Sequence, residues 1–315
     1  MAQMLQGDAP APDMELAVII LNWNAAADTI RCVGDVMSWK RLNPAIWVVD
    51  NGSTDGSADV ISRECPDVRL IRNSTNLGFA GGNNCAIDEA LAAGNAPLLL
   101  LNNDAFIGEE DVMRLLDTLR ADAQMGCVGP LLFDMEEKDR LLSAGAKNPA
   151  RHHQSHILAL AEGEPVRIVE CVPGTVILVR PDVFRTVGLL DEAYFFASEV
   201  ADLCLRAAQQ GFTSAIDTRA RAFHNLGRSS ALRDTLHSYY IIRNRFLLIR
   251  KFHHSWKLLF YGFWTLYSLA LSLKVQLNGK LATARAIRLG LLDGLRGRFG
   301  GQNERVLSIS SGVRQ

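Results

Sequence analysis

Short apolar runs that stop abruptly at polar residues constrain the fold of this chain more than any other feature. The runs cover residues 16–21, 45–49, 68–71 and 97–101, and helical patterns separate them at residues 28–39, 57–64 and 83–93. Strands that alternate with helices pair in parallel through right-handed crossovers. The sequence therefore predicts an α/β fold whose ligands bind beyond the carboxyl ends of these strands.

Polar clusters occupy the predicted strand ends, at residues 22–24, 50–55 and 102–104. The carboxylate of Asp50 falls where the second strand stops. From there it could accept a hydrogen bond from the N–H of a nucleobase or from a ribose hydroxyl. The same Asp-Asn-Gly-Ser sequence also suits an ordinary turn, so both interpretations stay open.

Three further segments have the residues of a phosphate and metal site. Asp104 follows four leucines, and a rigid carboxylate at a strand end suits a hard divalent cation, although a lone Asp there can equally cap a helix. His224 could supply a neutral imidazole ligand. The glycines of residues 76–84 would let the backbone approach a ligand closely.

Residues 191–206 supply candidate acid–base groups. Glu199 and Asp202 are three positions apart and would share one face of a helix, and Asp202 could pair with Arg206. Aromatic residues 194–196 would shield a carboxylate at the helix start and raise its pKa, as a general base requires. A helix cap followed by a surface ion pair is the competing interpretation.

The charge is divided unevenly along the chain. The net charge is −1, yet residues 219–315 contain 17 Lys and Arg against three Asp and Glu. Within this region residues 258–273 are uncharged, which is short of the roughly 20 residues needed to span a bilayer. Its basic flanks, among them Arg243 and Arg245, favour a helix lying in an anionic membrane surface. A spanning helix and a buried core or dimer helix are the alternatives.

Several motifs taken in order resemble a known family. Between Leu16 and Arg245 they are V-V-D-N-G-S-T-D-G-S, N-L-G-F-A-G-G-N-N, L-N-N-D, P-G-T-V-I-L-V-R-P-D-V-F, E-V-A-D-L-C-L-R and H-N-L-G-R-S-S. The chain resembles the family 2 inverting glycosyltransferases, in particular bacterial rhamnosyltransferases. This resemblance implies a GT-A fold, with a Rossmann-like nucleotide-binding half around a mixed central sheet.

The resemblance also implies roles for individual residues. Asp104 and His224 would hold Mg²⁺ or Mn²⁺, with Asn102 replacing an Asp of the family's D-x-D motif. Glu199 would be the base, with Asp202 second, because Val200 stands where many members place a carboxylate. Gly174 and Thr175 would lie on the acceptor side. The nucleotide-sugar contacts would come from Asn22, Asn24, Asp50, Asn51, Gly78, Phe79, Asn83, Asn102, Asn103 and Arg228.

The predicted function is transfer of a sugar, with rhamnose a candidate, from a nucleotide-diphosphate donor to a hydroxyl of a lipid-linked or polysaccharide acceptor. A non-catalytic nucleotide-sugar-binding protein and a nucleotidyltransferase are the alternatives. We expect a flexible tail at residues 1–14, a GT-A domain at 15–235 and a basic, apolar helical region at 236–315. We expect a peripheral protein on the cytoplasmic face of the cell membrane and no nucleic-acid partner. The sequence leaves a homo-oligomer open.

Overall fold

The structure is a computed structural model that describes residues 15–159, 163–226 and 231–311. The predicted tail at residues 1–14 lies outside the described residues. The strands are β1 (Leu16–Asn22), β2 (Pro44–Asn51), β3 (Arg69–Asn73), β4 (Leu98–Asn102), β5 (Ala105–Ile107), β6 (Met125–Asp134), β7 (Leu141–Ser143), β8 (Val166–Val169), β9 (Val176–Val179) and β10 (Thr213–His224). The helices are α1 (Ala26–Met37), α2 (Ser57–Glu64), α3 (Gly78–Ala93), α4 (Glu109–Ala121), α5 (Pro181–Val187), α6 (Glu199–Gln209), α7 (Ala231–Phe252), α8 (Lys257–Leu277), α9 (Leu281–Arg296) and α10 (Asn303–Ser311), with short 3-10 turns η1 (Glu192–Tyr194) and η2 (His254–Trp256).

One mixed sheet runs through the first two thirds of the chain. Its strand order is β3-β2-β1-β4-β9-β6-β10-β5, with β7 added beside β6 and β8 beside β10. The strands β1 to β4 pair in parallel, whereas β9 runs antiparallel to both β4 and β6. The predicted α/β class and mixed sheet are confirmed.

Helices cover both faces of the sheet, and alternate residues of each strand supply the two cores. In β1, Ala17 and Ile19 pack on one side with residues of α3, α5 and α6. Leu16, Val18 and Ile20 pack on the other with residues of α1, α2 and α4. This two-sided burial explains why β1 is apolar throughout rather than alternating.

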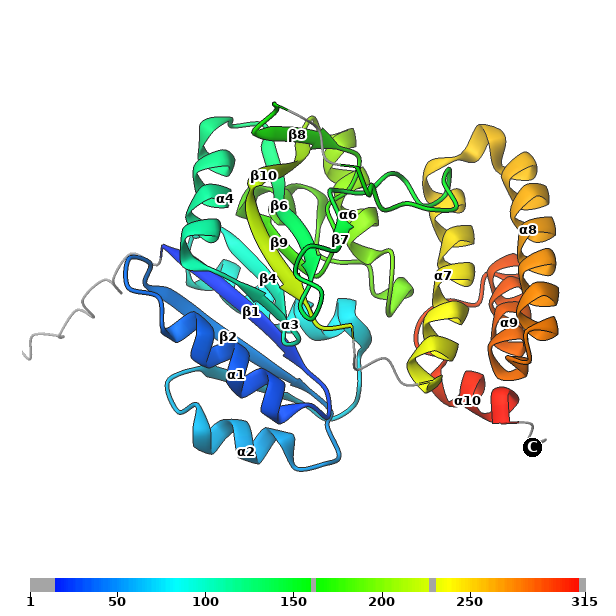
Figure 1. Cartoon of the computed structure of the whole chain (residues 1–315), viewed down its shortest axis with the longest axis horizontal. Coiled ribbons are helices and arrows are strands. Elements are labelled where there is room, and N and C mark those ends of the chain that lie inside the picture. Colours follow the sequence, from blue (N-terminus) through cyan, green and yellow to red (C-terminus); the bar gives the residue numbers. More distant parts are fainter. Residues whose placement is uncertain (1–14, 160–162, 227–230, 312–315) are drawn as a thin grey trace, which may run out of the picture.

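The C-terminal helices form a separate cluster beside the sheet, as Figure 1 shows in yellow to red. Their core joins α7, α8 and α9 to Tyr194 of η1 and Ala150 of the loop after β7. The indole N–H of Trp264 donates to the carbonyl of Ala150 at 2.8 Å. The ammonium of Lys251 pairs with Asp191 at 2.9 Å and also with Asp202. The C-terminal helices are therefore bonded directly to the segment that begins α6.

Two features of the basic region differ from the sequence prediction. Helix α7 begins at Ala231, before the predicted boundary at residue 235. Arg243 and Arg245, which we assigned to the membrane-facing basic flank, are buried, with exposed fractions of 0% and 6%. Aromatic rings explain this burial, because Arg243 lies over Tyr240 at 4.7 Å and Arg245 over Trp264 at 3.7 Å.

Candidate active site

The polar ends of the parallel strands lie together at one edge of the sheet. The pairing register sets Asn22 opposite Asp50. The side-chain NH₂ of Asn22 donates to the Asp50 carboxylate at 2.7 Å, and the hydroxyl of Thr29 donates to the side-chain oxygen of Asn22 at 2.8 Å. The amide of Asn103 in turn donates to Thr29 at 3.0 Å. These contacts join three predicted donor-binding residues into one network with fixed side-chain orientations.

Asn24 and Asn51 lie at the same edge, but their side chains bond to the protein. Asn24 adopts a positive φ of 52°, and its side-chain oxygen accepts the N–H of Thr54 at 2.9 Å. The amide of Asn51 donates to the carbonyl of Gly78 at 2.9 Å, and its oxygen accepts the N–H of Leu77 at 3.1 Å. Both residues therefore shape the loops around the site.

The glycine-rich segment forms the first turns of α3 rather than the loop that precedes it. Gly78 has a φ of 77°, and a Cβ there would lie 2.3 Å from the carbonyl oxygen of Phe195. The N–H of Phe79 donates to that same oxygen at 2.6 Å. Inside the helix, the amide of Asn83 donates to the carbonyl of Phe79 at 2.8 Å. The donor-side segment therefore touches the segment that leads to Glu199.

The two predicted metal ligands are neighbours, although their positions are far apart in the sequence. His224 ends β10 and pairs with Ala105 of β5, which brings its Nε2 atom to 3.1 Å from Oδ1 of Asp104. Both side chains are buried except for about a tenth of their surface, Asp104 at 8% and His224 at 9% exposed. The carboxylate of Asp104 is the type of ligand that suits Mn²⁺ or Mg²⁺, and the imidazole of His224 is close enough to be a second ligand. Within the described ranges, no group of three or more His, Cys, Asp or Glu side chains could hold a metal ion.

Glu199 begins α6 and is buried at 6% exposed. Among the residues that the structure describes, its Oε2 atom has no hydrogen-bond partner. Burial, aided by the nearby charge of Asp202, raises the pKa of Glu199 to about 7. The direction of this shift agrees with the sequence prediction for a shielded carboxylate at the helix start.

Asp202 differs from Glu199 in having several partners. The predicted pairing with Arg206 is present at 2.6 Å, but it is buried rather than on the surface. The hydroxyl of Tyr194 donates to Asp202 at 3.1 Å, and Lys251 pairs with the same carboxylate. These bonds occupy both oxygens of Asp202, so its carboxylate serves as a buried anchor for α6 and α7.

The loop before β9 lies between the strand end and α6. The carbonyl of Thr175 accepts the backbone N–H of Asn102 at 3.0 Å. A Cβ on Gly174 would lie 2.9 Å from Val200, whose side chain belongs to the sheet core. Val200 therefore faces the core. Arg228, assigned to the donor diphosphate, lies outside the described residues.

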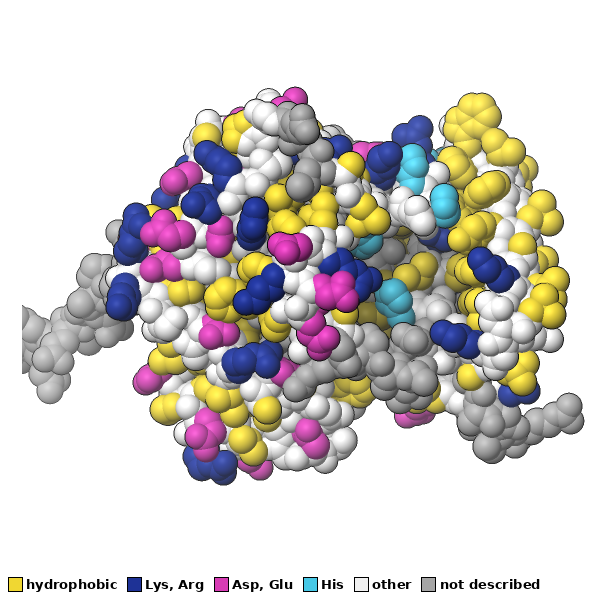
Figure 2. All heavy atoms as spheres, in the orientation of Figure 1, with side chains coloured by type: hydrophobic (Ala, Val, Ile, Leu, Met, Phe, Trp, Pro, Cys, Tyr) yellow, Lys and Arg dark blue, Asp and Glu magenta, His cyan; other side chains and the backbone are white. Residues whose placement is uncertain are grey.

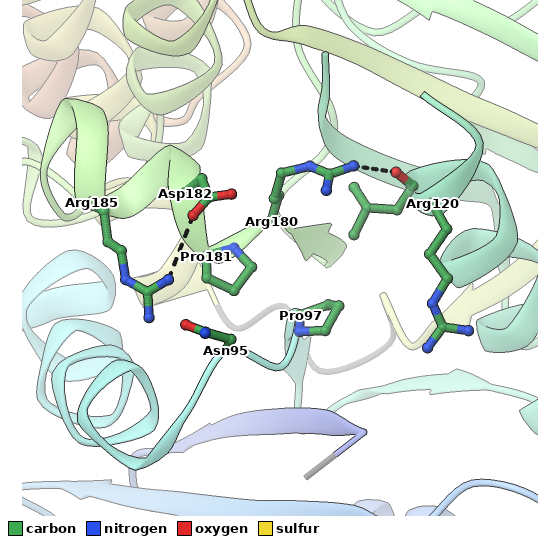
Figure 3. A pocket seen from close by; sticks show the side chains of 8 residues that line it. Asn95, Pro97, Arg120, Arg180, Pro181, Asp182 and Arg185 are labelled. Atoms are coloured by element: carbon green, nitrogen blue, oxygen red, sulfur yellow. Dashed lines mark hydrogen bonds and ion pairs between the residues drawn. The ribbon is translucent and has the colours of Figure 1, made fainter. Parts of the chain in front are cut away.

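A small pocket of about 230 Å³ lies at the opposite end of β4, beside Asn95 and Pro97 (Figure 3). The guanidinium of Arg180 is bonded there to the backbone carbonyls of Met125 and Asp122, each at 2.9 Å. Because it lies at the end of β4 away from the polar strand ends, this pocket is not part of the candidate site.

Comparison with known proteins identifies the family. The profile of glycosyl transferase family 2 matches residues 17–175. The chain belongs to this family. It is 26% identical over 277 residues to an N-acetylglucosaminyl-diphospho-decaprenol L-rhamnosyltransferase of Mycobacterium tuberculosis, covering 79% of this chain and 89% of that protein. It is 25% identical to the dTDP-rhamnosyl transferase RfbF of Shigella flexneri, covering 90% and 96% of the two chains.

A solved structure supports the fold. The structure of GalNAc-T7 with UDP, GalNAc and Mn²⁺ aligns with a TM-score of 0.61 at 15% identity. The alignment covers 79% of this chain and half of that one. The GT-A fold and the glycosyltransferase activity predicted from the sequence are confirmed, in preference to a non-catalytic protein or a nucleotidyltransferase.

Several residues that the sequence analysis did not single out bond to the site residues or to the segments that position them. Thr29 links two strand ends, and Lys251 holds Asp202 from a distant helix. Arg243 and Asn244 of α7 bond to the carbonyls of residues 193, 194, 196 and 197. The available signal was a cation and an amide side by side between the apolar residues 241–242 and 246–249, where charged and amide side chains are uncommon.

The contact between Gly78 and Phe195 leads to a first prediction. In Gly78→Ala the new Cβ must displace Phe195, so we expect the turnover number for sugar transfer to fall about tenfold or more. Gly56→Ala is the matched control, because Gly56 has a φ of 82° and nothing within 4 Å of the added Cβ. The left-handed backbone should cost each variant roughly 1–2 kcal/mol of stability, and the contact with Phe195 should cost Gly78→Ala more. Equal turnover losses in the two variants would refute a role for this contact.

Proposed function

We propose that this glycosyltransferase moves an L-rhamnosyl group from a nucleoside diphosphate donor to a hydroxyl of a sugar carried on a lipid diphosphate. The names of the two relatives support this choice of donor sugar, and the M. tuberculosis relative supports this acceptor class. The observation that carries the mechanism is the buried carboxylate of Glu199, which has an oxygen without a partner among the described residues.

In this proposal Glu199 is the general base. Its pKa of about 7 matches removal of a proton from an acceptor hydroxyl near neutral pH. The hydroxyl oxygen then forms a bond to the anomeric carbon as the bond to the nucleotide diphosphate breaks on the opposite side, which inverts the anomeric configuration. Asp202, held by Arg206, Tyr194 and Lys251, fixes α6 beneath the base.

The base assignment predicts different effects for two substitutions of Glu199. Glu199→Gln should lower turnover by about 10²- to 10⁴-fold, and Glu199→Asp should retain part of it. In the parent enzyme the rate should rise with pH through about 7, because only ionised Glu199 accepts the proton.

Stability measurements provide the control. A pKa above the ordinary 4.5 means that Glu199 favours the folded state when protonated, and this contribution is lost as pH rises through about 7. At pH 8, Glu199→Gln should therefore unfold at a temperature no lower than the parent, whereas Asp202→Asn should unfold earlier. Near-normal turnover in Glu199→Gln would exclude it as the base.

We also propose that Asp104 and His224 hold Mn²⁺ or Mg²⁺ together with the donor diphosphate. A bound divalent cation supplies positive charge that stabilises the leaving diphosphate. On the protein side, Asp50 and Asn22 are fixed beside each other where the nucleoside would bind. The remaining strand-end residues, Asn102 and Asn103, lie between these two parts of the site and would contact the donor.

Thermal unfolding with a panel of donors tests the substrate and the metal together. With Mn²⁺ present, dTDP-rhamnose should raise the unfolding temperature more than UDP-N-acetylglucosamine or GDP-mannose, since ligand binding to the native state adds RT ln(1 + [L]/Kd) to its stability. Asp104→Ala and addition of EDTA should each abolish this shift. If Asp104→Ala binds and turns over the donor as well as the parent does, and the parent keeps both activities in EDTA, the metal assignment is wrong.

The apolar face of α8 supports a peripheral position on an anionic membrane. Residues 254–277 have the length and composition of a membrane-crossing helix. However, Trp264, Ser268 and Ser272 are buried against the neighbouring helices, with Ser272 bonded to the carbonyl of Ala284 in α9. The opposite face is exposed, and Figure 2 shows it as a band of hydrophobic side chains along the right edge. Its members include Leu258, Leu259, Phe263, Leu266, Leu269, Leu273 and Leu277.

This one-sided packing favours a helix that lies in the cytoplasmic membrane surface and meets the lipid-linked acceptor there. Exposed basic residues of α8, α9 and the turn between them flank the apolar face and would contact anionic headgroups. They are Lys274, Lys280, Arg285, Arg288 and Arg296. The competing occupant is a second copy of the chain, since an apolar face of this kind also suits a dimer interface.

Vesicle flotation of the full-length protein distinguishes these cases. Leu266→Glu combined with Leu273→Glu should abolish binding to vesicles that contain anionic lipid, while the parent binds less as salt increases. Ile168→Glu is the matched control, because Ile168 is also exposed, at 62%, but lies on β8. Substitution is preferable to truncation near residue 250, which would strip the core shared by α7, α8 and α9. Vesicle binding that the double variant does not change, or a dimer that it dissociates, would refute the membrane proposal.

A further inference from the structure

Arg243 and Asn244 are adjacent on α7, and both are completely buried. The side-chain oxygen of Asn244 accepts the Nε–H of Arg243 at 2.9 Å, so its NH₂ group must point the other way. That NH₂ group lies 3.1 Å from the carbonyl oxygen of Tyr194, 2.8 Å from that of Phe196 and 2.6 Å from that of Ala197.

Arg243 reinforces this arrangement. Its guanidinium donates to the carbonyls of Ala193 at 3.2 Å and Tyr194 at 2.8 Å, and also to Gly300 before α10. The rings of Tyr239, Tyr240 and Phe299 surround the cation. An arginine enclosed in this way can hold the amide of Asn244 in a single orientation.

The segment that these side chains hold has an unusual backbone. Phe195, Ala197 and Ser198 all have positive φ angles, of 61°, 67° and 77°, although none of them is glycine. Residues with side chains keep this conformation only where surrounding contacts impose it. Glu199 follows directly, and the N–H of Asp202 donates to the carbonyl of Ser198 at 2.9 Å. The position of Glu199 is therefore set by the path of residues 195–198.

We propose that Asn244, oriented by Arg243, is a positioning residue for sugar transfer, which fixes the segment before Glu199 and keeps the base carboxylate buried. This inference rests on the proposed role of Glu199. It makes α7 part of the catalytic machinery rather than only a link to the membrane-facing helices.

Burial raises the pKa of Glu199 more than the neighbouring charge does. Asp202 is the ionisable neighbour whose charge acts on Glu199, and burial acts more strongly than that charge. Arg206 and Lys251 are bonded to Asp202, and the Tyr194 hydroxyl donates to it as well. A change that lets water reach Glu199 without altering these partners would lower its pKa toward the ordinary 4.5.

Infrared titration of the carboxyl band tests this independently of activity. The band that disappears in Glu199→Gln identifies Glu199, and in the parent it should titrate near pH 7. In Asn244→Ala its midpoint should fall by about one pH unit. Arg243→Lys retains the charge but loses the Nε–H bond to Asn244, so it should shift the midpoint in the same direction by a smaller amount. If Asn244→Ala fails to fold, Arg243→Lys takes its place as the test variant.

Turnover provides the second measurement, with dTDP-rhamnose and a synthetic short-chain lipid diphosphate bearing N-acetylglucosamine. In Asn244→Ala we expect the turnover number to fall about tenfold or more, the KM for the donor to change little, and the acidic limb of the pH profile to follow the infrared midpoint. Asn148→Ala is the matched control, because Asn148 is a buried asparagine that bonds to Ala150 and His253, away from residues 195–198.

The outcomes separate this inference from the proposed function. An Asn244→Ala protein with an unshifted infrared midpoint, or a shift equal to that of Asn148→Ala, overturns the positioning role. Normal turnover in Glu199→Gln would instead refute the base assignment and, with it, a catalytic role for Asn244.

Discussion

The register of the parallel strands is the constraint on which the rest of the site depends. Asn22 pairs with Asp50 across β1 and β2, and Leu21 pairs with Asn102 across β1 and β4. The three strands therefore end within two residues of each other, and their polar residues meet at one edge. A shift of one position would turn every side chain of the shifted strand to the other face of the sheet and separate Asn22 from Asp50.

The sequence predicted this edge because the apolar runs stop where the strands stop. Strands β1, β2 and β4 were located within one or two residues, and so were the polar clusters that follow them. Strand β10 was missed because it mixes polar and apolar residues and shifts its register between Asp217 and Arg221. His224 was consequently assigned from its residue type and the family resemblance, whereas its position beside Asp104 depends on the pairing of β10 with β5.

The two candidate carboxylates show where sequence reasoning reached its limit. Their spacing correctly predicted that Glu199 and Asp202 begin one helix. Spacing could not show that Lys251, far along the chain, would neutralise Asp202 while an oxygen of Glu199 stays without a partner among the described residues. That difference arises from tertiary packing of α7 on α6, and it makes one carboxylate an anchor and the other a candidate base.

The same packing divides the basic residues of the C-terminal region into two sets with different roles. Those that point inward, such as Arg243 and Lys251, bond to carbonyls and carboxylates next to α6. Those on the outside, such as Arg285 and Arg288, remain exposed beside the apolar face of α8. A charge count along the sequence cannot separate the two sets, which is why the whole region was interpreted as membrane-facing. Since α7 contains the inward set and packs on the helix that bears the outward face, docking of α8 on a lipid surface would act on the same rigid cluster that holds the segment before Glu199.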